Sequence, residues 1–238
     1  MSGHSKWATI KHQKAANDAA RGKLFSKLVK AIQIAVKTGG GTSPDTNPKL
    51  RVAIDAARAA NMPKDNIDRA ISRASGEAAN VEELTYEGFG PEGVGVLVQV
   101  ATDNRNRTGQ EIKNLFERSG GSLAGPGSVS HNFEPKGYIL IEKKPDSDAQ
   151  MLELIDLGVE DVEASQEGIE VYTGPTTLFD LREKLEASGH KVLQTELIQK
   201  PKTHLDLKGE SSDKVLKLLD SLDDHDDVQK LFTNADFA

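Results

Sequence analysis

Apolar residues recur at helical spacing through the first third of the chain. From about His12 to Lys37 they predict one long helix, whose apolar side comprises Leu24, Phe25, Leu28, Val29, Ile32 and Val36. Gly39-Gly-Gly41 ends this helix, because glycine tolerates the left-handed conformation that follows a helix C-terminus. Asn47-Pro48 and Pro63 are start signals for two further helices. The pattern therefore predicts a small helical bundle.

After Glu87 the pattern changes to short apolar runs separated by turns. We expect a buried strand over 93–101, a helix opened by a capping box at Thr108-Gly-Gln-Glu111, and a strand within 125–133. A compact β-α-β-β-α-β run follows, with predicted elements at 138–143, 148–157, 162–165, 170–173, 178–187 and 192–198. The last stretch predicts a strand at 203–207, a helix at 213–222 and a strand at 227–233.

These elements predict an α+β protein of three domains. Residues 1–76 form the helical bundle, and a linker at 76–81 leads into two ferredoxin-like α/β domains. The complete unit at 135–201 is inserted into the other domain, which combines 82–134 with 202–238. Short right-handed connections favour this arrangement over one large sheet.

Composition restricts the chemistry. The chain has 238 residues and no cysteine, which excludes disulfides and thiolate metal sites and suits a reducing compartment. The start of the chain lacks the apolar core of a secretory signal, and no run approaches the roughly 18–20 apolar residues of a membrane span. We expect a cytoplasmic monomer that does not bind membranes.

Charge is distributed unevenly along the chain. Residues 1–75 carry 14 Lys and Arg against 5 Asp and Glu, a net charge of +9, and the remainder carries −16. A field of this shape attracts a phosphate backbone at one end of the molecule and repels it at the other. The asymmetry therefore predicts a nucleic-acid partner, either DNA or ribosomal RNA, and the acidic domains are suited to contact basic ribosomal proteins.

The strongest positive signal is a lysine stripe on the first helix. Its lysines lack the interspersed glutamates of an ordinary exposed helix, and they continue a basic N-terminal tail. Trp7 and His12 are possible stacking partners for a base, although Trp7 could equally cap the bundle. The predicted nucleic-acid contacts of this region are Lys6, Trp7, Lys11, His12, Lys14, Arg21, Lys23, Lys27 and Lys30.

Two further arginines stand in a predicted loop between a strand and a helix. Arg105 and Arg107 lie within Asp103-Asn-Arg-Asn-Arg107. The loop is either simply polar or a contact to phosphate or to a protein carboxylate, and we favour the contact because loops after strands often carry sites.

No catalytic, cofactor or metal site is expected. Gly88-Phe-Gly-Pro-Glu-Gly93 matches the dinucleotide fingerprint literally, but it precedes a strand and contains Pro91, so we interpret it as a turn. The six histidines have no metal-ligand spacing. The acidic run 223–227 could hold a hard cation, but we favour a loop of solvated acids.

The motifs Gly3-His-Ser-Lys-Trp7, Arg21-Gly-Lys23, Asn47-Pro48, Met62-Pro-Lys-Asp65 and Tyr86-Glu-Gly88 give the chain its resemblance to one known family. Together with Lys11-His12, Lys14, Gly39-Gly-Gly41 and Gly90-Pro91, they make it similar to the YebC/PmpR family over essentially its whole length. The family includes bacterial proteins named as transcriptional regulators and a mitochondrial translational activator of cytochrome c oxidase subunit I.

The resemblance implies three domains, the third inserted, and a non-enzymatic role in gene expression. It leaves two roles open: a DNA-binding transcriptional regulator, or a ribosome-associated factor that relieves stalling, for example at proline runs. The chain has no obvious recognition helix with base-reading side chains, and its cations are mostly lysines, which suit phosphate contacts without sequence readout. A protein–protein adaptor with incidental charge is a third hypothesis, and it predicts binding that is insensitive to salt.

Overall fold

The structure is a computed structural model that describes residues 18–74 and 81–237, with only the backbone described for residues 18–21. Three helices come first: α2 (Asp18–Thr38), α3 (Pro48–Ala59) and α4 (Lys64–Ala74). Their shared core is aliphatic, with Ile32, Leu50 and Ala57 fully buried. The predicted bundle is confirmed within the described residues, and the part of the first helix predicted before Asp18 lies outside them.

A tight loop joins α2 to α3. Asn47 is fully buried and caps α3 by accepting a hydrogen bond from the Leu50 amide at 3.0 Å. Its Nδ2 donates to the carbonyl oxygens of Ala35 and Gly41, each at 2.8 Å. A Cβ on Gly39 would come within 2.0 Å of Asn47 Oδ1, so no other residue fits there. The predicted cap is therefore also the centre of the loop.

The second domain has a four-stranded antiparallel sheet in the order β3-β1-β2-β9. Its strands are β1 (Glu82–Phe89), β2 (Gly95–Thr102), β3 (Ser122–Ala124) and β9 (Val228–Thr233). The helices α5 (Arg105–Arg118) and α8 (Glu210–Asp223) supply Ile112, Phe116 and Leu218 to the main core of this domain. Two short strands, β8 (Leu205–Leu207) and β10 (Ala235–Phe237), pair in parallel outside the sheet.

The structure differs from the predicted elements in four places. The strand between β2 and β3 is β1, which the pattern did not predict, and the 203–207 segment predicted for the sheet pairs instead with β10. The strand predicted over 125–133 is wrong: a 3-10 turn at Ser130–Asn132 precedes a strand that begins at Phe133. The helix predicted to begin at Thr108 begins at Arg105, with Asn104 as its N-cap.

The inserted unit has the ferredoxin-like order β5-β6-β4-β7, all neighbours antiparallel. Its elements are β4 (Phe133–Ile141), α6 (Ser147–Asp156), β5 (Asp161–Ala164), β6 (Ile169–Thr173), α7 (Leu178–Ala187) and β7 (Val192–Pro201). They follow the prediction closely, except that β4 lies earlier than the predicted 138–143 and β7 extends beyond the predicted 192–198. The α+β class, with a helical part followed by sheets, is confirmed. The exact domain boundaries remain a prediction.

The two sheets are joined by an apolar core. Leu97 and Phe232 of the first sheet are buried with Phe133, Tyr138 and Ile198 of the second. Lys230 Nζ on β9 also lies 2.8 Å from Glu196 Oε2 on β7. Apolar burial of this kind holds two domains in one orientation.

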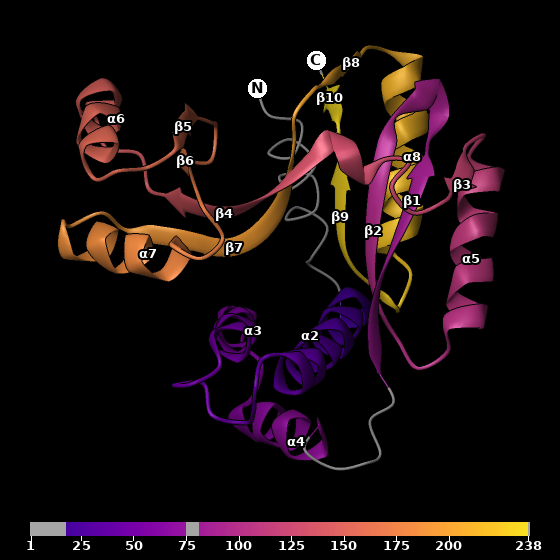
Figure 1. The fold of residues 1–238 in the computed structure, drawn as a ribbon, viewed down its shortest axis with the longest axis horizontal. Helices are drawn as coiled ribbons and strands as arrows, with labels where there is room; N and C mark the ends of the chain where they lie inside the picture. The colour runs from indigo at the N-terminus through magenta and orange to yellow at the C-terminus, as the bar shows by residue number, and fades with distance from the viewer. Residues whose placement is uncertain (1–17, 75–80, 238) are drawn as a thin grey trace.

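The helical domain is attached differently (Figure 1). Helix α2 lies against the end of the first sheet near β2 and β9, and α3 lies near α7 of the inserted unit. Within the described residues, no buried apolar cluster combines residues of 18–74 with residues of 81–237. Polar contacts therefore dominate this attachment, and one of them joins Asp55 Oδ2 to Arg182 Nη1 at 3.4 Å.

Candidate nucleic-acid interface

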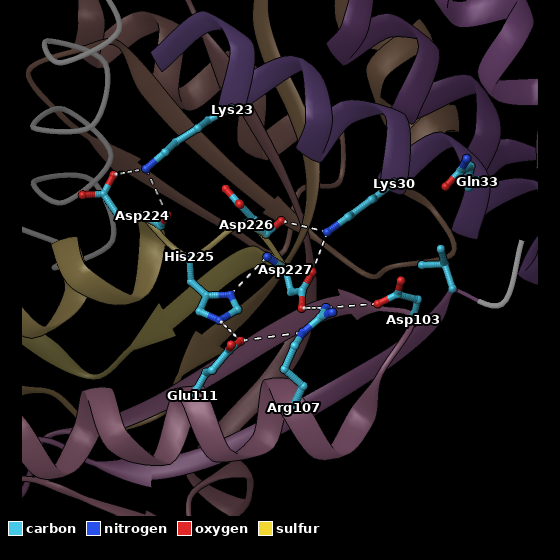
Figure 2. A pocket seen from close by; sticks show the side chains of 11 residues that line it. Lys23, Lys30, Gln33, Asp103, Arg107, Glu111, Asp224, His225, Asp226 and Asp227 are labelled. Carbon is cyan, nitrogen blue, oxygen red and sulfur yellow. Dashed lines mark hydrogen bonds and ion pairs between the residues drawn. The ribbon is translucent and has the colours of Figure 1, made fainter. Parts of the chain in front are cut away.

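Three lysines of the predicted stripe face an acidic loop of the second domain, and Figure 2 shows two of them, Lys23 and Lys30. We call Lys23, Lys27 and Lys30 the lysine face, and residues 223–227, which link α8 to β9, the acidic loop. The Nζ atoms of the three lysines lie 3.7, 3.3 and 2.5 Å from carboxylate oxygens of Asp224, Asp223 and Asp227 respectively. Each ammonium also donates to a backbone carbonyl of the acidic loop.

The expectation of a loop of solvated acids is therefore wrong for two of its members. The carboxylate of Asp227 is only 5% exposed and that of Asp223 is partly buried, each against a lysine. Aspartates in this position neutralise charges that would otherwise repel one another along one side of a helix. Asp224 and Asp226 remain exposed, as the charge-run argument predicted.

Asp227 is the centre of the contact. Its carboxylate accepts hydrogen bonds from Lys30 Nζ at 2.5 Å, Thr108 Oγ1 at 2.6 Å and Arg107 Nη2 at 3.0 Å. Burial opposes ionisation of Asp227, but these three donors outweigh it and hold the pKa of the carboxyl well below its usual range. Its backbone carbonyl accepts from the Ala101 amide at 2.8 Å, which fixes the acidic loop to β2.

Two hydrogen-bonded threonine hydroxyls, those of Thr102 and Thr108, lead to the Asp227 carboxylate. The Asn104 amide donates to Thr102 Oγ1 at 2.9 Å, and Thr102 and Thr108 hydroxyls lie 2.8 Å apart, both fully buried. Because an ionised carboxylate only accepts, Thr108 gives its proton to Asp227, and Thr102 gives its own to Thr108. Thr108 therefore serves a tertiary contact rather than capping a helix.

The two arginines predicted as contacts have different positions. Arg107 is 46% exposed and binds Asp103 Oδ1 at 3.0 Å as well as Asp227, and the hydrogen bond to Asp227 raises its pKa. Its partner is thus a protein carboxylate, one of the alternatives the sequence left open. The Arg105 side chain is exposed at the start of α5, and its carbonyl accepts from the Tyr86 hydroxyl at 3.0 Å.

The neighbouring histidine provides the one group of possible metal ligands among the described residues. Single ligand atoms of Glu111, His225 and Asp227 all lie within 4.8 Å of one another. However, His225 Nδ1 accepts from the Asp227 amide at 3.1 Å, so Nε2 carries the proton that it donates to Glu111 Oε2 at 2.9 Å. With Lys30 and Arg107 on Asp227, these groups form a satisfied hydrogen-bond network and offer no free imidazole lone pair.

A polar cavity of about 630 Å³ lies between α2, α5 and the acidic loop. It is lined from one side by Lys23, Lys30 and Gln33 and from the other by Asp103, Arg107, Glu111 and the acidic loop (Figure 2). Its walls contain cations and acids that pair across the gap. The cavity is therefore a polar part of the junction between the two domains.

Other predicted contacts lie elsewhere. Outside the described residues are Lys6, Trp7, Lys11, His12 and Lys14, and of Arg21 only the backbone within α2 is described. On the described surface of the helical domain, five further cations are exposed and form no ion pair with a described carboxylate: Lys37, Lys49, Lys64, Arg69 and Arg73. The lysine face is therefore only part of the positive surface.

The glycine-rich segment at 88–93 is a turn, as expected. It comprises the end of β1 and a 3-10 turn at Pro91–Gly93 before β2. Beside it, Glu87 is buried and accepts hydrogen bonds from the amides of Gly127, Val129 and Ser130 at 2.8, 2.7 and 2.9 Å. Burial alone would raise the pKa of Glu87, but these amides lower it overall.

The fold and the junction define a three-domain α+β protein whose basic helical domain rests on an acidic α/β body. Comparison with known proteins agrees: residues 5–77 match the family description "TACO1/YebC protein N-terminal domain", and residues 81–235 match "TACO1/YebC second and third domain". The chain belongs to the TACO1/YebC family. None of the described helices is both long and apolar enough to cross a membrane.

Relatives are similar over their full lengths. A protein of Dictyoglomus turgidum named "Probable transcriptional regulatory protein" is 51% identical over 99% of this chain and 96% of its own. One of Trichlorobacter lovleyi with the same name is 46% identical over 100% and 97%. The crystal structure of a conserved hypothetical protein from Aquifex aeolicus superposes with a TM-score of 0.89 at 43% identity, covering 98% of each chain.

Proposed function

We propose that this protein is a non-enzymatic regulator of gene expression that binds nucleic acid through its basic N-terminal third. The observation that carries the proposal is the net charge of +9 on residues 1–75 against −16 on the rest. Only part of that positive charge is neutralised by the acidic loop. The names of the relatives support a regulatory role.

Lysines account for 9 of the 14 cations in this third of the chain. A lysine ammonium contacts phosphate as a point charge and carries little base information, whereas arginine reads guanine through two hydrogen bonds. We therefore propose binding with low intrinsic sequence specificity. The contacts would include Lys6, Lys11 and Lys14, with Trp7 and His12 available for stacking on bases.

Fluorescence anisotropy with a labelled RNA and a labelled duplex DNA tests the proposal. The variant Lys6→Gln/Lys11→Gln/Lys14→Gln should bind at least about tenfold more weakly than the wild type at low salt. The matched control is Lys143→Gln/Lys208→Gln/Lys217→Gln, which removes three exposed lysines from the other two domains. Equal weakening by both variants, or by neither, would place the binding surface elsewhere.

A second candidate role is binding to ribosomal RNA as a translation factor. It is favoured by the strongly acidic body, which long duplex DNA would repel but which basic ribosomal proteins would attract. Sedimentation of a lysate through a sucrose gradient at two salt concentrations separates the roles. Salt-sensitive migration with ribosomes, lost in the Lys6/Lys11/Lys14 variant, would favour translation. Absence from ribosomal fractions at both salts would favour DNA.

A further inference from the structure

We propose that the acidic loop competes with nucleic acid for the lysine face, so that polyanion binding and docking of the helical domain on the second domain exclude one another. The inference rests on the proposed function and concerns how that function is regulated. Aspartate carboxylates hold Lys23, Lys27 and Lys30 where phosphate oxygens would be held by the same ammonium groups.

The first support is the occupancy of the lysine face. Lys27 is mostly buried between α2 and the acidic loop, and its ammonium reaches both the carboxylate and the carbonyl of Asp223. Lys30 reaches the carboxylate of Asp227 and the carbonyl of Asp226. While the loop holds these two lysines, both ammonium groups are already bound to its carboxylate and carbonyl oxygens, so a phosphate backbone must displace the loop to bind them.

The second support is the character of the junction. Within the described residues, the apolar core of the helical domain does not extend into the other domains, whereas an apolar core joins the two sheets. The ion pairs that join described residues across the junction are those to the acidic loop and the Asp55–Arg182 pair. Such contacts weaken with salt and exchange readily for other ions, so the helical domain can separate while the two sheets stay together.

The third support is that the acidic loop is held in place by its own domain, independently of the lysine face. The acidic loop is anchored: the Asp227 carbonyl accepts from Ala101, its carboxylate from Thr108 and Arg107, and its amide donates to His225. The loop therefore keeps its shape when the lysines leave. The loop therefore competes with nucleic acid as a preformed anionic surface and does not have to order itself first, as a flexible tail would.

The competition has a measurable consequence. If only the undocked fraction binds nucleic acid with its lysine face, the apparent dissociation constant is the intrinsic one divided by that fraction. Exposed and partly exposed ion pairs each shift such an equilibrium modestly. Neutralising Asp223 and Asp224 should therefore tighten binding of a labelled RNA by about 5- to 30-fold.

The test compares Asp223→Asn/Asp224→Asn with Asp148→Asn/Asp156→Asn, which makes the same charge change at exposed positions of α6, far from α2 (Figure 1). Affinity is measured by anisotropy on a labelled single-stranded RNA and a duplex DNA. The proposal predicts tightening by the first variant beyond that of the control. Equal affinity of the two variants would overturn it, while measurable binding by the wild type would leave the proposed function standing.

A second readout follows the domains directly. The chain contains no cysteine, so Ala59→Cys on α3 and Lys208→Cys before α8, both exposed, can carry a fluorescent donor and acceptor in an otherwise intact protein. Saturating RNA should change the energy transfer, and Asp223→Asn/Asp224→Asn should shift it in the same direction without RNA. Unchanged transfer in the RNA complex would refute the exclusion. Absence of binding to both the RNA and the duplex DNA by every variant would instead refute the proposed function.

Discussion

Replacing Asp227 by asparagine probes the centre of the junction. The carboxylate accepts from Lys30 on Oδ1 and from Arg107 and Thr108 on Oδ2. An asparagine side chain offers one acceptor oxygen and one donor NH₂ group. In either orientation the NH₂ group therefore faces at least one donor, and a negative charge between two cations is lost.

The expected loss of stability follows from the burial of Asp227 and of its two cationic partners. Removing one partner of a fully buried ion pair costs about 3–5 kcal/mol, and a hydrogen bond to a charged group contributes about 1.5–3 kcal/mol. Asp227 itself is buried, but the side chains of Lys30 and Arg107 are 25% and 46% exposed, so water replaces part of what they lose. We expect Asp227→Asn to lower the free energy of unfolding by about 2–3 kcal/mol at neutral pH.

The pH dependence provides an internal check. The pKa of Asp227 is lower in the folded than in the unfolded protein. Its contribution to the free energy of unfolding is therefore complete above the unfolded-state pKa of about 3.9 and is lost as pH falls below that value. The difference in stability between wild type and Asp227→Asn should be constant between about pH 5 and 7 and shrink below about pH 4.

Urea unfolding followed by circular dichroism measures this difference, and hydrogen exchange of the α2 amides localises it. Asp226→Asn is the matched control, because Asp226 carries the same charge one position away with an exposed side chain. It should change stability by less than about 0.5 kcal/mol. Equal stability of Asp227→Asn and wild type, or a difference that persists undiminished in acid, would show that the Asp227 carboxylate does not stabilise the junction.

Three other predictions concern the supporting structure. Asn47→Asp keeps the cap on the Leu50 amide but replaces the donor to the Ala35 and Gly41 carbonyls by an acceptor. Thermal unfolding should therefore show that the free energy of unfolding falls by about 2–3 kcal/mol. A fall of less than about 0.5 kcal/mol would contradict the loop geometry. Glu87→Gln places an NH₂ group against the backbone amides of 127–130 and should accelerate proteolysis in that loop. In the wild type, whose Glu87 pKa is lowered, the same acceleration should come only below about pH 4. Equal proteolysis rates of the variant and the wild type at neutral pH would count against this role of Glu87. Gly22→Ala, at an exposed helical position with open space around it, should stabilise the protein by about 0.5–1 kcal/mol. Gly39→Ala should destabilise the protein, because its Cβ would overlap Asn47. A change in the free energy of unfolding of the same sign for both variants in urea titrations would contradict this.

Local signals predicted much of this fold. The N-cap of α3 is encoded by two adjacent residues, Asn47 and Pro48, and the inserted unit has clear strand and helix periods bounded by turns. By contrast, the pattern does not reveal β1, because the strand begins with two exposed glutamates and its only buried positions are Glu87 and Gly88. Neither residue type signals a strand.

The junction could not be predicted, because its partners are far apart in the chain. Lys30 and Asp227 are separated by 197 positions, and Thr108 and Asp227 by 119. The lysine spacing and the acidic run were both visible, but each alone is also typical of a solvated surface. The N-cap at Asn104 is hidden for a related reason: Thr108 has the pattern of a cap, yet its hydroxyl is used by the distant Asp227.

We propose above all that this protein binds nucleic acid through phosphate contacts from its basic third. The most direct test is the dependence of the dissociation constant of a labelled RNA on salt between about 50 and 200 mM. With about six lysines or arginines on phosphates, the logarithm of the binding constant should fall with the logarithm of salt concentration with a slope of roughly −4 to −5. Binding that is unaffected by salt, or no binding of either this RNA or a duplex DNA at the lower concentration, would contradict phosphate contacts from this part of the chain.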